Sequence, residues 1–254
     1  MLANYEKLLD LKCFSHKDAM QLFGDARRTT NILYALKKKG LIRSVRRDCY
    51  AVVSLKTREL AATPFEIASH IAENTWISHL SAFEYYGAAD RRGGDVWVSS
   101  ETSFREFEFD GCRYHCLSGM GGFGILEREG VRVTDLERTI LDGIRDMGKL
   151  GGTKELAGCL ERMPPVREQV MLDYLERYQN QFLYQKAGYL LSYFPQMGLT
   201  EAFFDCCRCY KGQSSRYLYG GPGTGGCTFL KEWNLCVPED LLQLMEERGI
   251  KEMV

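Results

Sequence analysis

Apolar and polar positions change their spacing several times along the chain, and each change marks a predicted element. Apolar residues at helical spacing over residues 5–14 predict a first helix. Ser15 is followed three residues later by Asp18, a capping-box pattern that predicts the start of a second helix, HKDAMQLF, which ends at Gly24.

A third helix and a hairpin follow. The segment RRTTNILYALKKK predicts a helix that ends at Gly40. The runs LIRSV and CYAVV are rich in strand-forming residues and flank Arg46, Arg47 and Asp48, which predicts a hairpin. Helix, helix, turn, helix and hairpin is the order of a winged helix-turn-helix, so we predict such a domain over residues 1–58.

The third helix has two different faces. At about 100° per residue, its apolar side carries Thr29, Ile32, Leu33 and Leu36. The other side, with the hairpin, carries residue types that read base edges or bind phosphates. The predicted DNA-binding residues are Arg27, Arg28, Thr30, Asn31, Tyr34, Lys37 and Lys38 on the helix, and Arg43, Arg46 and Arg47 on the hairpin.

The remaining residues, 59–254, predict a mixed domain with a small, mainly antiparallel sheet and several helices. Alternating runs around Asp110-Gly111 and across Glu129-Gly130 predict two hairpins, and DVWVSSE predicts a further strand. Thr134 with Glu137 predicts a capping box before the helix of LERTILDGIRDM. Helices then dominate up to residue 210, with short strands and a last helix after them. The whole chain is therefore expected to belong to the α/β (α+β) class.

Charge is divided unevenly between these two parts. Residues 1–58 contain 13 Lys or Arg and 5 Asp or Glu, a net charge of +8, whereas the rest contains 20 and 29, a net charge of −9. A polyanion is therefore expected to bind the first part and not the second. No stretch has the length and apolarity of a membrane helix, and the N-terminal MLANYEKLLD lacks the pattern of a signal peptide, so we expect a cytoplasmic protein without a membrane partner.

The segment YLYGGPGTGGCTF raises the question of a nucleotide-binding P-loop. In a P-loop the glycine frame is followed by Lys and by Ser or Thr, which hold phosphate and Mg²⁺. Here these two positions are Gly226 and Cys227, and the segment after them does not predict a helix. We therefore predict no ATP binding and interpret Gly220–Gly226 as part of a flexible connection that runs from SSRYLY to the strand in EWNLCVP and includes CTFL.

Metal sites are also disfavoured. Cys112 and Cys116 would share one face of a strand while His115 points to the other, so the three side chains do not converge. Cys206 and Cys209 would share a helix face, but zinc needs four ligands. We expect no metal and no cofactor, and mostly thiols among the ten cysteines.

Two groups of residues have catalytic types. Asp135, Asp142 and Asp146 share a helix face with Arg138, a pattern compatible with acid–base chemistry or Mg²⁺ binding, but helix-dipole stabilisation and an i,i+4 ion pair explain it more simply. His79 and Ser81 lack a glycine elbow, and a helix N-cap accounts for Ser81. We predict no catalytic residues.

The chain resembles the AbiEi-type antitoxins of abortive-infection (type IV) toxin–antitoxin systems. The resemblance is carried by GLIRSVRRDCYAV, by ISHLSAFEYYG, which is similar to the family's "shlSAL-x-x-hG", by VTDLERTILDGI, which is close to "V-x-D-x-ERT-LLD", and by QKAGYLLSYF. Together these segments span most of residues 1–200. The family usually has Gly in the hairpin turn, where this chain has Asp48.

The resemblance implies a DNA-binding repressor of its own operon that neutralises a nucleotidyltransferase-like toxin and binds double-stranded DNA of its own promoter. It leaves open whether the toxin is contacted. Two alternatives remain: a nuclease or nucleotidyltransferase that the first domain targets to DNA, and a protein-interaction module whose basic part binds an acidic partner.

Overall fold

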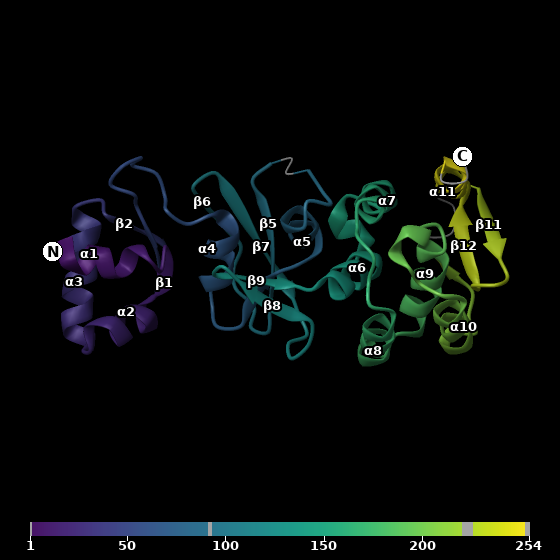
Figure 1. Cartoon of the computed structure of the whole chain (residues 1–254), viewed down its shortest axis with the longest axis horizontal. Helices are drawn as coiled ribbons and strands as arrows, with labels where there is room; N and C mark the ends of the chain where they lie inside the picture. Colours follow the sequence, from purple (N-terminus) through teal and green to yellow (C-terminus); the bar gives the residue numbers. More distant parts are fainter. Residues whose placement is uncertain (1, 91–92, 220–225, 252–254) are drawn as a thin grey trace. The chain divides into compact units, whose positions relative to one another are not determined.

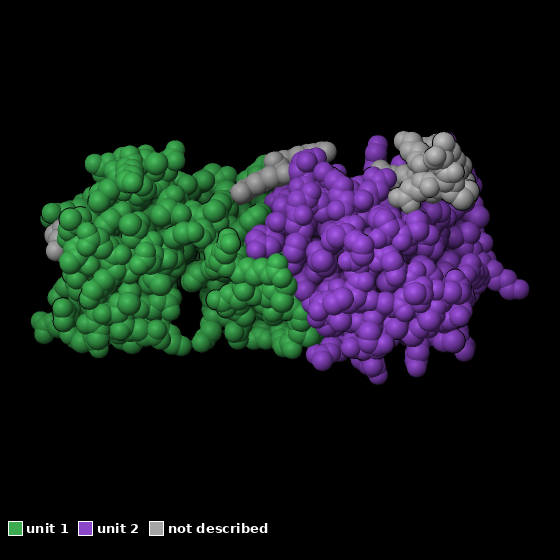
Figure 2. All heavy atoms as spheres, in the orientation of Figure 1, with its two compact units in different colours: residues 1–81, 91–134 green, residues 82–90, 135–254 purple. Residues whose placement is uncertain are grey.

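The computed structural model describes residues 2–90, 93–219 and 226–251, and the predicted glycine connection at residues 220–225 lies outside them. The chain forms a mixed α+β fold that divides into two compact units, shown in separate colours in Figure 2. The first unit comprises residues 1–81 and 91–134, and the second comprises residues 82–90 and 135–254. The first unit thus includes the predicted domain 1–58 together with a sheet that follows it. The predicted boundary at residue 58 stays a prediction.

The first 52 residues contain three helices and a three-stranded sheet (Figure 1). In the sheet, β3 lies between β1 and β2, antiparallel to both. The hairpin turn contains Asp48 at φ +59°, a left-handed conformation that Asp tolerates. The elements are α1 (Leu2–Leu9), β1 (Cys13–Ser15), α2 (His16–Phe23), α3 (Ala26–Lys38), β2 (Ile42–Arg46) and β3 (Cys49–Val52).

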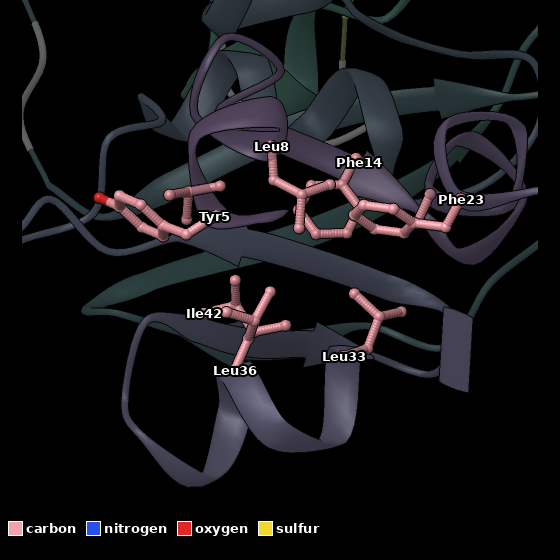
Figure 3. Close-up of a cluster of buried hydrophobic side chains, with 9 residues drawn as sticks. Tyr5, Leu8, Phe14, Phe23, Leu33, Leu36 and Ile42 are labelled. Atoms are coloured by element: carbon pink, nitrogen blue, oxygen red, sulfur yellow. The ribbon is translucent and has the colours of Figure 1, made fainter. Parts of the chain in front are cut away.

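These elements enclose a hydrophobic core of their own, drawn in Figure 3. Aromatic and aliphatic side chains of α1, β1 and α2 meet those of α3 and the hairpin. Complete burial of each such side chain contributes roughly 1.5–3 kcal/mol, which is enough to hold the helices in place. The fully buried members include Tyr5, Leu8, Phe14, Leu33, Leu36 and Ile42.

A six-stranded sheet completes the first unit, in the order β6-β7-β5-β4-β9-β8 (Figure 1). Both predicted hairpins are confirmed, since β6 pairs with β7 and β8 with β9 in antiparallel fashion. Helix α4 (Pro64–His70) packs against β4, β5 and β9. The strands are β4 (Thr75–Ile77), β5 (Asp95–Ser100), β6 (Phe107–Phe109), β7 (Cys112–Ser118), β8 (Ile125–Arg128) and β9 (Val131–Thr134).

The centre of this sheet is more parallel than the sequence predicted. The strands β5 and β7 pair in parallel over six residue pairs, and β4 pairs in parallel with β9. Each hairpin predicted from the sequence is local, whereas each parallel pair joins a hairpin strand, β7 or β9, to a strand outside the hairpins, β5 or β4. A local alternation of side chains carries no information on which distant strand becomes the neighbour.

The second unit is mostly helical and ends in a small three-stranded sheet with the order β10-β12-β11 (Figure 1). Helix α5 (His79–Tyr85) carries the chain from the first unit into the second. The elements after residue 134 are α6 (Leu136–Arg145), η1 (Met147–Leu150), α7 (Thr153–Glu161), α8 (Glu168–Tyr178), α9 (Gln181–Leu191), η2 (Pro195–Met197), α10 (Glu201–Tyr210), β10 (Arg216–Tyr217), β11 (Cys227–Leu230), β12 (Leu235–Pro238) and α11 (Glu239–Lys251).

Three local predictions in this region are wrong. The N-cap of α6 is Asp135 and not Thr134, because the Asp135 carboxylate accepts a hydrogen bond from the Arg138 backbone N–H. Ser81 does not cap α5, because that helix begins two residues earlier, at His79. The segment Cys227–Leu230, interpreted from the sequence as connection, forms β11 and pairs with β12.

Among the described residues, no helix has the length and apolarity needed to cross a membrane.

Candidate nucleic-acid interface

The turn between α2 and α3 fixes where α3 begins. Helix α2 starts at the predicted capping box of Ser15 and Asp18, and both of its hydrogen bonds are present. It ends at Gly24, whose φ of +87° requires glycine, and whose N–H donates to the Met20 carbonyl. Asp25 then caps α3 by accepting hydrogen bonds from the backbone N–H groups of the first helical turn. These local contacts set the rotation of α3 about its axis.

The predicted division of α3 into two faces is confirmed. Thr29, Leu33 and Leu36 are fully buried, and Ile32 packs against the same core. Tyr34, in contrast, is 69% exposed. The seven predicted helix residues all lie on the exposed side: Arg27, Arg28, Thr30, Asn31, Tyr34, Lys37 and Lys38.

The cations of this face have no acidic partner. Within the described residues, Arg27, Arg28, Lys37 and Lys38 form no ion pair. Phosphate groups could thus approach them without displacing a carboxylate. Thr30 is partly engaged, because its hydroxyl donates to the Ala26 carbonyl and lies 3.3 Å from the His16 imidazole.

A hollow of about 590 Å³ adjoins the start of this face. Its polar lining includes Arg27, Arg28 and Asn31 together with Asp25, and its apolar lining includes Ile32 and Leu36. Cationic and amide side chains beside apolar ones suit an anionic group attached to a flat apolar one, as in a nucleotide.

The hairpin arginines have different surroundings. Arg43 forms a 2.5 Å ion pair with Asp110 and stacks on the Phe109 ring. Arg46 is half-buried, and its guanidinium lies over the rings of Phe104 and Phe107.

The third predicted hairpin arginine is the most exposed of the three. Arg47 is 93% exposed, with Asp48 as a neighbour at 3.6 Å. Arg43 and Arg46 contact β6, the turn after it and the loop before it, so phosphate binding by either would have to compete with existing contacts. Arg47 therefore resembles the exposed cations of α3 more than Arg43 and Arg46 do, although it forms an exposed ion pair with Asp48.

The carboxylates of α6 that suggested catalysis are buried and already engaged. Asp142 is 1% exposed; it accepts hydrogen bonds from the Tyr178 hydroxyl at 2.7 Å and lies within 3.4 Å of Arg138 and 3.0 Å of Arg145. The predicted i,i+4 pair of Arg138 and Asp142 is thus present. The sequence did not predict that both side chains of this pair would be almost inaccessible to solvent.

The other carboxylates at α6 also have partners, two of them from α8 and its N-cap. Asp135 accepts a 2.7 Å hydrogen bond from the Tyr174 hydroxyl, and Glu137 accepts three from Arg167, at 2.7–3.0 Å. Burial by itself would raise the pKa of Glu137, but the hydrogen bonds from Arg167 outweigh it and lower that pKa. Asp146, the third aspartate of the predicted group, pairs with Arg145 and Lys149. Carboxylates held in this way are poor candidates for binding a metal or shuttling protons.

The remaining residues of catalytic type also have structural contacts. The Ser81 hydroxyl accepts a hydrogen bond from the Trp97 backbone N–H, and the His79 imidazole lies 2.8 Å from the Ser78 hydroxyl. His115 lies between Asp95 and Glu106 and stacks on Trp97. Over the part of the chain that the structure describes, no three His, Cys, Asp or Glu side chains are grouped for a metal ion.

Comparison with known proteins gives a likeness of fold. No protein-family model and no curated protein matches the chain. The chain is similar to the RV2827C protein from Mycobacterium tuberculosis, whose crystal structure superposes with a TM-score of 0.62 over 95% of this chain and 93% of that one, at 13% identity. The mixed α+β architecture is therefore shared along almost the full length of both chains.

Proposed function

We propose that this protein is a sequence-specific DNA-binding transcriptional repressor whose residues 1–58 form a winged helix-turn-helix domain. The observation that carries the proposal is the exposed face of α3, where four cations form no ion pair with any described residue and lie beside Thr30, Asn31 and Tyr34. A helix with one side in its own core and a basic, amide-bearing other side fits the major groove of DNA. In this arrangement Asn31 contacts base edges, and Lys37, Lys38 and Arg47 contact phosphates.

We further propose that it acts in the cytoplasm as the antitoxin of an abortive-infection operon, repressing that operon and neutralising a nucleotidyltransferase-like toxin. This step rests on the resemblance of GLIRSVRRDCYAV, ISHLSAFEYYG and VTDLERTILDGI to the AbiEi-type antitoxins. The alternative of a DNA-targeted enzyme is less well supported, because Asp135, Asp142 and Asp146 are engaged by Arg and Tyr side chains.

Fluorescence anisotropy of the full chain tests the DNA-binding proposal. DNA from upstream of the gene is compared with a scrambled duplex over a salt series. We expect a preference of about a thousandfold and a steep salt dependence. Equal and weak binding to both duplexes would contradict a sequence-specific repressor.

A substitution on α3 tests the assignment of base reading. Asn31→Ala should relax the preference between the operator and single-base variants about tenfold, because an amide that bonds a base edge is lost. An unchanged preference would remove Asn31 from base reading. Thr30→Ala serves as a comparison variant, since the Thr30 hydroxyl already donates to the Ala26 carbonyl within its own helix.

A further inference from the structure

A groove in the second unit is lined by acidic, amide and aromatic side chains. It has a volume of about 550 Å³ and lies between α8, the start of α9 and α10. The side chains that matter here are Asp173 and Glu176 from α8, Gln181 and Tyr184 from α9, and Tyr210 from α10. No Lys or Arg lines it. The groove therefore has a net negative charge beside an aromatic wall.

The acidic side chains of the groove differ in their ion pairing from most of those around α6 and α10. Asp135, Asp142 and Glu201 each have an arginine partner. Asp173 accepts only the Gln169 amide, and neither it nor Glu176 forms an ion pair with any described residue. Two carboxylates that share a groove without a counter-charge favour a cationic ligand.

A tyrosine hydroxyl at the same place also lacks a hydrogen-bond partner among the described residues. Tyr184 is only 7% exposed, yet among the described residues nothing forms a hydrogen bond with its hydroxyl group. Burial raises the pKa of Tyr184 to about 12, with smaller contributions from Cys206, Cys207 and Glu176, so the phenol stays protonated and can accept or donate a hydrogen bond. Because Tyr184 lines the groove, a ligand bound there can form a hydrogen bond with this hydroxyl group.

Elsewhere in the second unit, the protein already binds one of its own arginine side chains between a tyrosine ring and a carboxylate. Arg145 lies 4.9 Å from the centre of the Tyr178 ring and 3.0 Å from the Asp142 carboxylate. A tyrosine face and a carboxylate together thus hold a guanidinium group. The groove offers the same pair of features, because Tyr184 stacks on Tyr210 with ring centres 5.6 Å apart, next to two free carboxylates.

We propose that this groove binds an arginine side chain presented by a segment of a partner protein. The planar guanidinium has five N–H donors for the carboxylates and the Tyr184 hydroxyl, and its face stacks on the tyrosine rings. The groove is larger than one guanidinium, and the side-chain amides along it, such as Gln181, match the polar groups of a peptide backbone. The proposal does not depend on DNA binding, since it concerns only the second unit.

The test uses the full chain and fluorescein-labelled hexapeptides with two arginines among glycine and asparagine. Matched peptides carry lysine or citrulline, the uncharged analogue of arginine. Anisotropy should show saturable binding of the arginine peptide, with at least tenfold weaker binding of the other two. Spermidine at the same concentration should not displace it. Absence of saturation, equal binding of the lysine or citrulline peptide, or displacement by spermidine would overturn the proposal.

Substitutions in the groove test whether the arginine peptide binds there. Asp173→Asn with Glu176→Gln should weaken the arginine peptide at least tenfold, and Tyr184→Phe, which removes only the hydroxyl, about threefold. The control Glu155→Gln with Glu161→Gln removes the same charge from α7 and should change the dissociation constant less than twofold. A control that loses as much affinity as the groove variant would show nonspecific attraction and overturn the site. Thermal unfolding followed by circular dichroism establishes that each variant is folded.

Discussion

Helices α3 and α6 carry similar residue types but give them opposite surroundings. On α3, Arg27 and Lys37 are exposed and have no ion-pair partner in the described part of the chain. On α6, Arg138 and Asp142 are 1% exposed and lie within 3.4 Å of one another. The charges of α3 are available to a ligand, and those of α6 are neutralised inside the protein.

The difference shows that the type of a charged residue does not assign its role. An unpaired cation in water keeps its long-range field and can attract a polyanion. A buried ion costs several kcal/mol in lost hydration unless partners surround it, so it adds to stability only as a member of its group. DNA binding should therefore respond to changes on α3, and stability to changes on α6.

The largest expected effect is on stability, from Asp142→Ala. The substitution leaves Arg138 buried without its carboxylate and removes the acceptor of the Tyr178 hydroxyl. We expect a loss of about 3–5 kcal/mol in the free energy of unfolding, measured by urea denaturation. Asp173→Ala, on the exposed side of α8, serves as the control and should cost less than about 0.5 kcal/mol. Equal effects of the two would mean that the α6 cluster does not stabilise the protein.

Much of this comparison follows from the sequence, but only where contacts are local. The faces of α3, the capping box at Ser15 and the hairpin at Asp110-Gly111 each depend on residues a few positions apart, and all were predicted. The partners of α6 were not, since Tyr174 and Tyr178 lie 39 and 36 residues away from the carboxylates that they contact. A helical pattern specifies which residues share a face and not what that face will touch.

The same reason explains why the sequence did not predict the surroundings of the hairpin arginines. Their spacing indicates a basic hairpin, but Arg43 meets Asp110 from 67 positions further along the chain. A net charge of +8 over residues 1–58 therefore overstates the charge available to DNA. Only the fold identifies which cations are already neutralised.

The second prediction tests whether the exposed cations of α3 bind phosphate groups. Lys37→Ala with Lys38→Ala should weaken binding to all DNA sequences and reduce the slope of log K against log salt by about 2, because two phosphate contacts are lost. Stability should change little, as both side chains are exposed. A matched pair on the first helices, Lys7→Ala with Lys17→Ala, should leave the slope unchanged. An unaltered slope in the α3 variant would contradict phosphate binding by these lysines.

The third prediction concerns the dependence of stability on pH. The hydrogen bonds from Arg167 lower the pKa of Glu137 below its ordinary value near 4.5. A lowered pKa stabilises the folded protein above the ordinary value, and the contribution is lost as the pH falls through the folded pKa. Because Arg167 is 65% exposed and screened by water, we expect Glu137→Gln to cost only about 1 kcal/mol at pH 6.

That cost should shrink as the pH falls below 4.5 and through the lowered pKa of Glu137, because the wild-type carboxylate then becomes protonated as well. Urea midpoints of wild type and variant at pH 6, 4.5 and 3.5 measure the change. A difference that stays constant over this range would show that the charge of Glu137 does not contribute. Glu168→Gln, half-buried at the start of α8, provides a carboxylate control outside the α6 cluster.

The smallest expected effect distinguishes a paired cation from an open one within the same hairpin. Arg43→Ala should weaken DNA binding less than twofold, because the Asp110 ion pair and the Phe109 ring already hold this guanidinium. Arg47→Ala should weaken it about threefold, since Arg47 is 93% exposed. Removing the competing carboxylate with Asp110→Ala should strengthen DNA binding slightly, and only when Arg43 is present. If Arg43→Ala instead exceeds Arg47→Ala in anisotropy titrations at low salt, then DNA displaces Asp110, and the pairing seen in the unbound protein does not limit which arginines bind DNA.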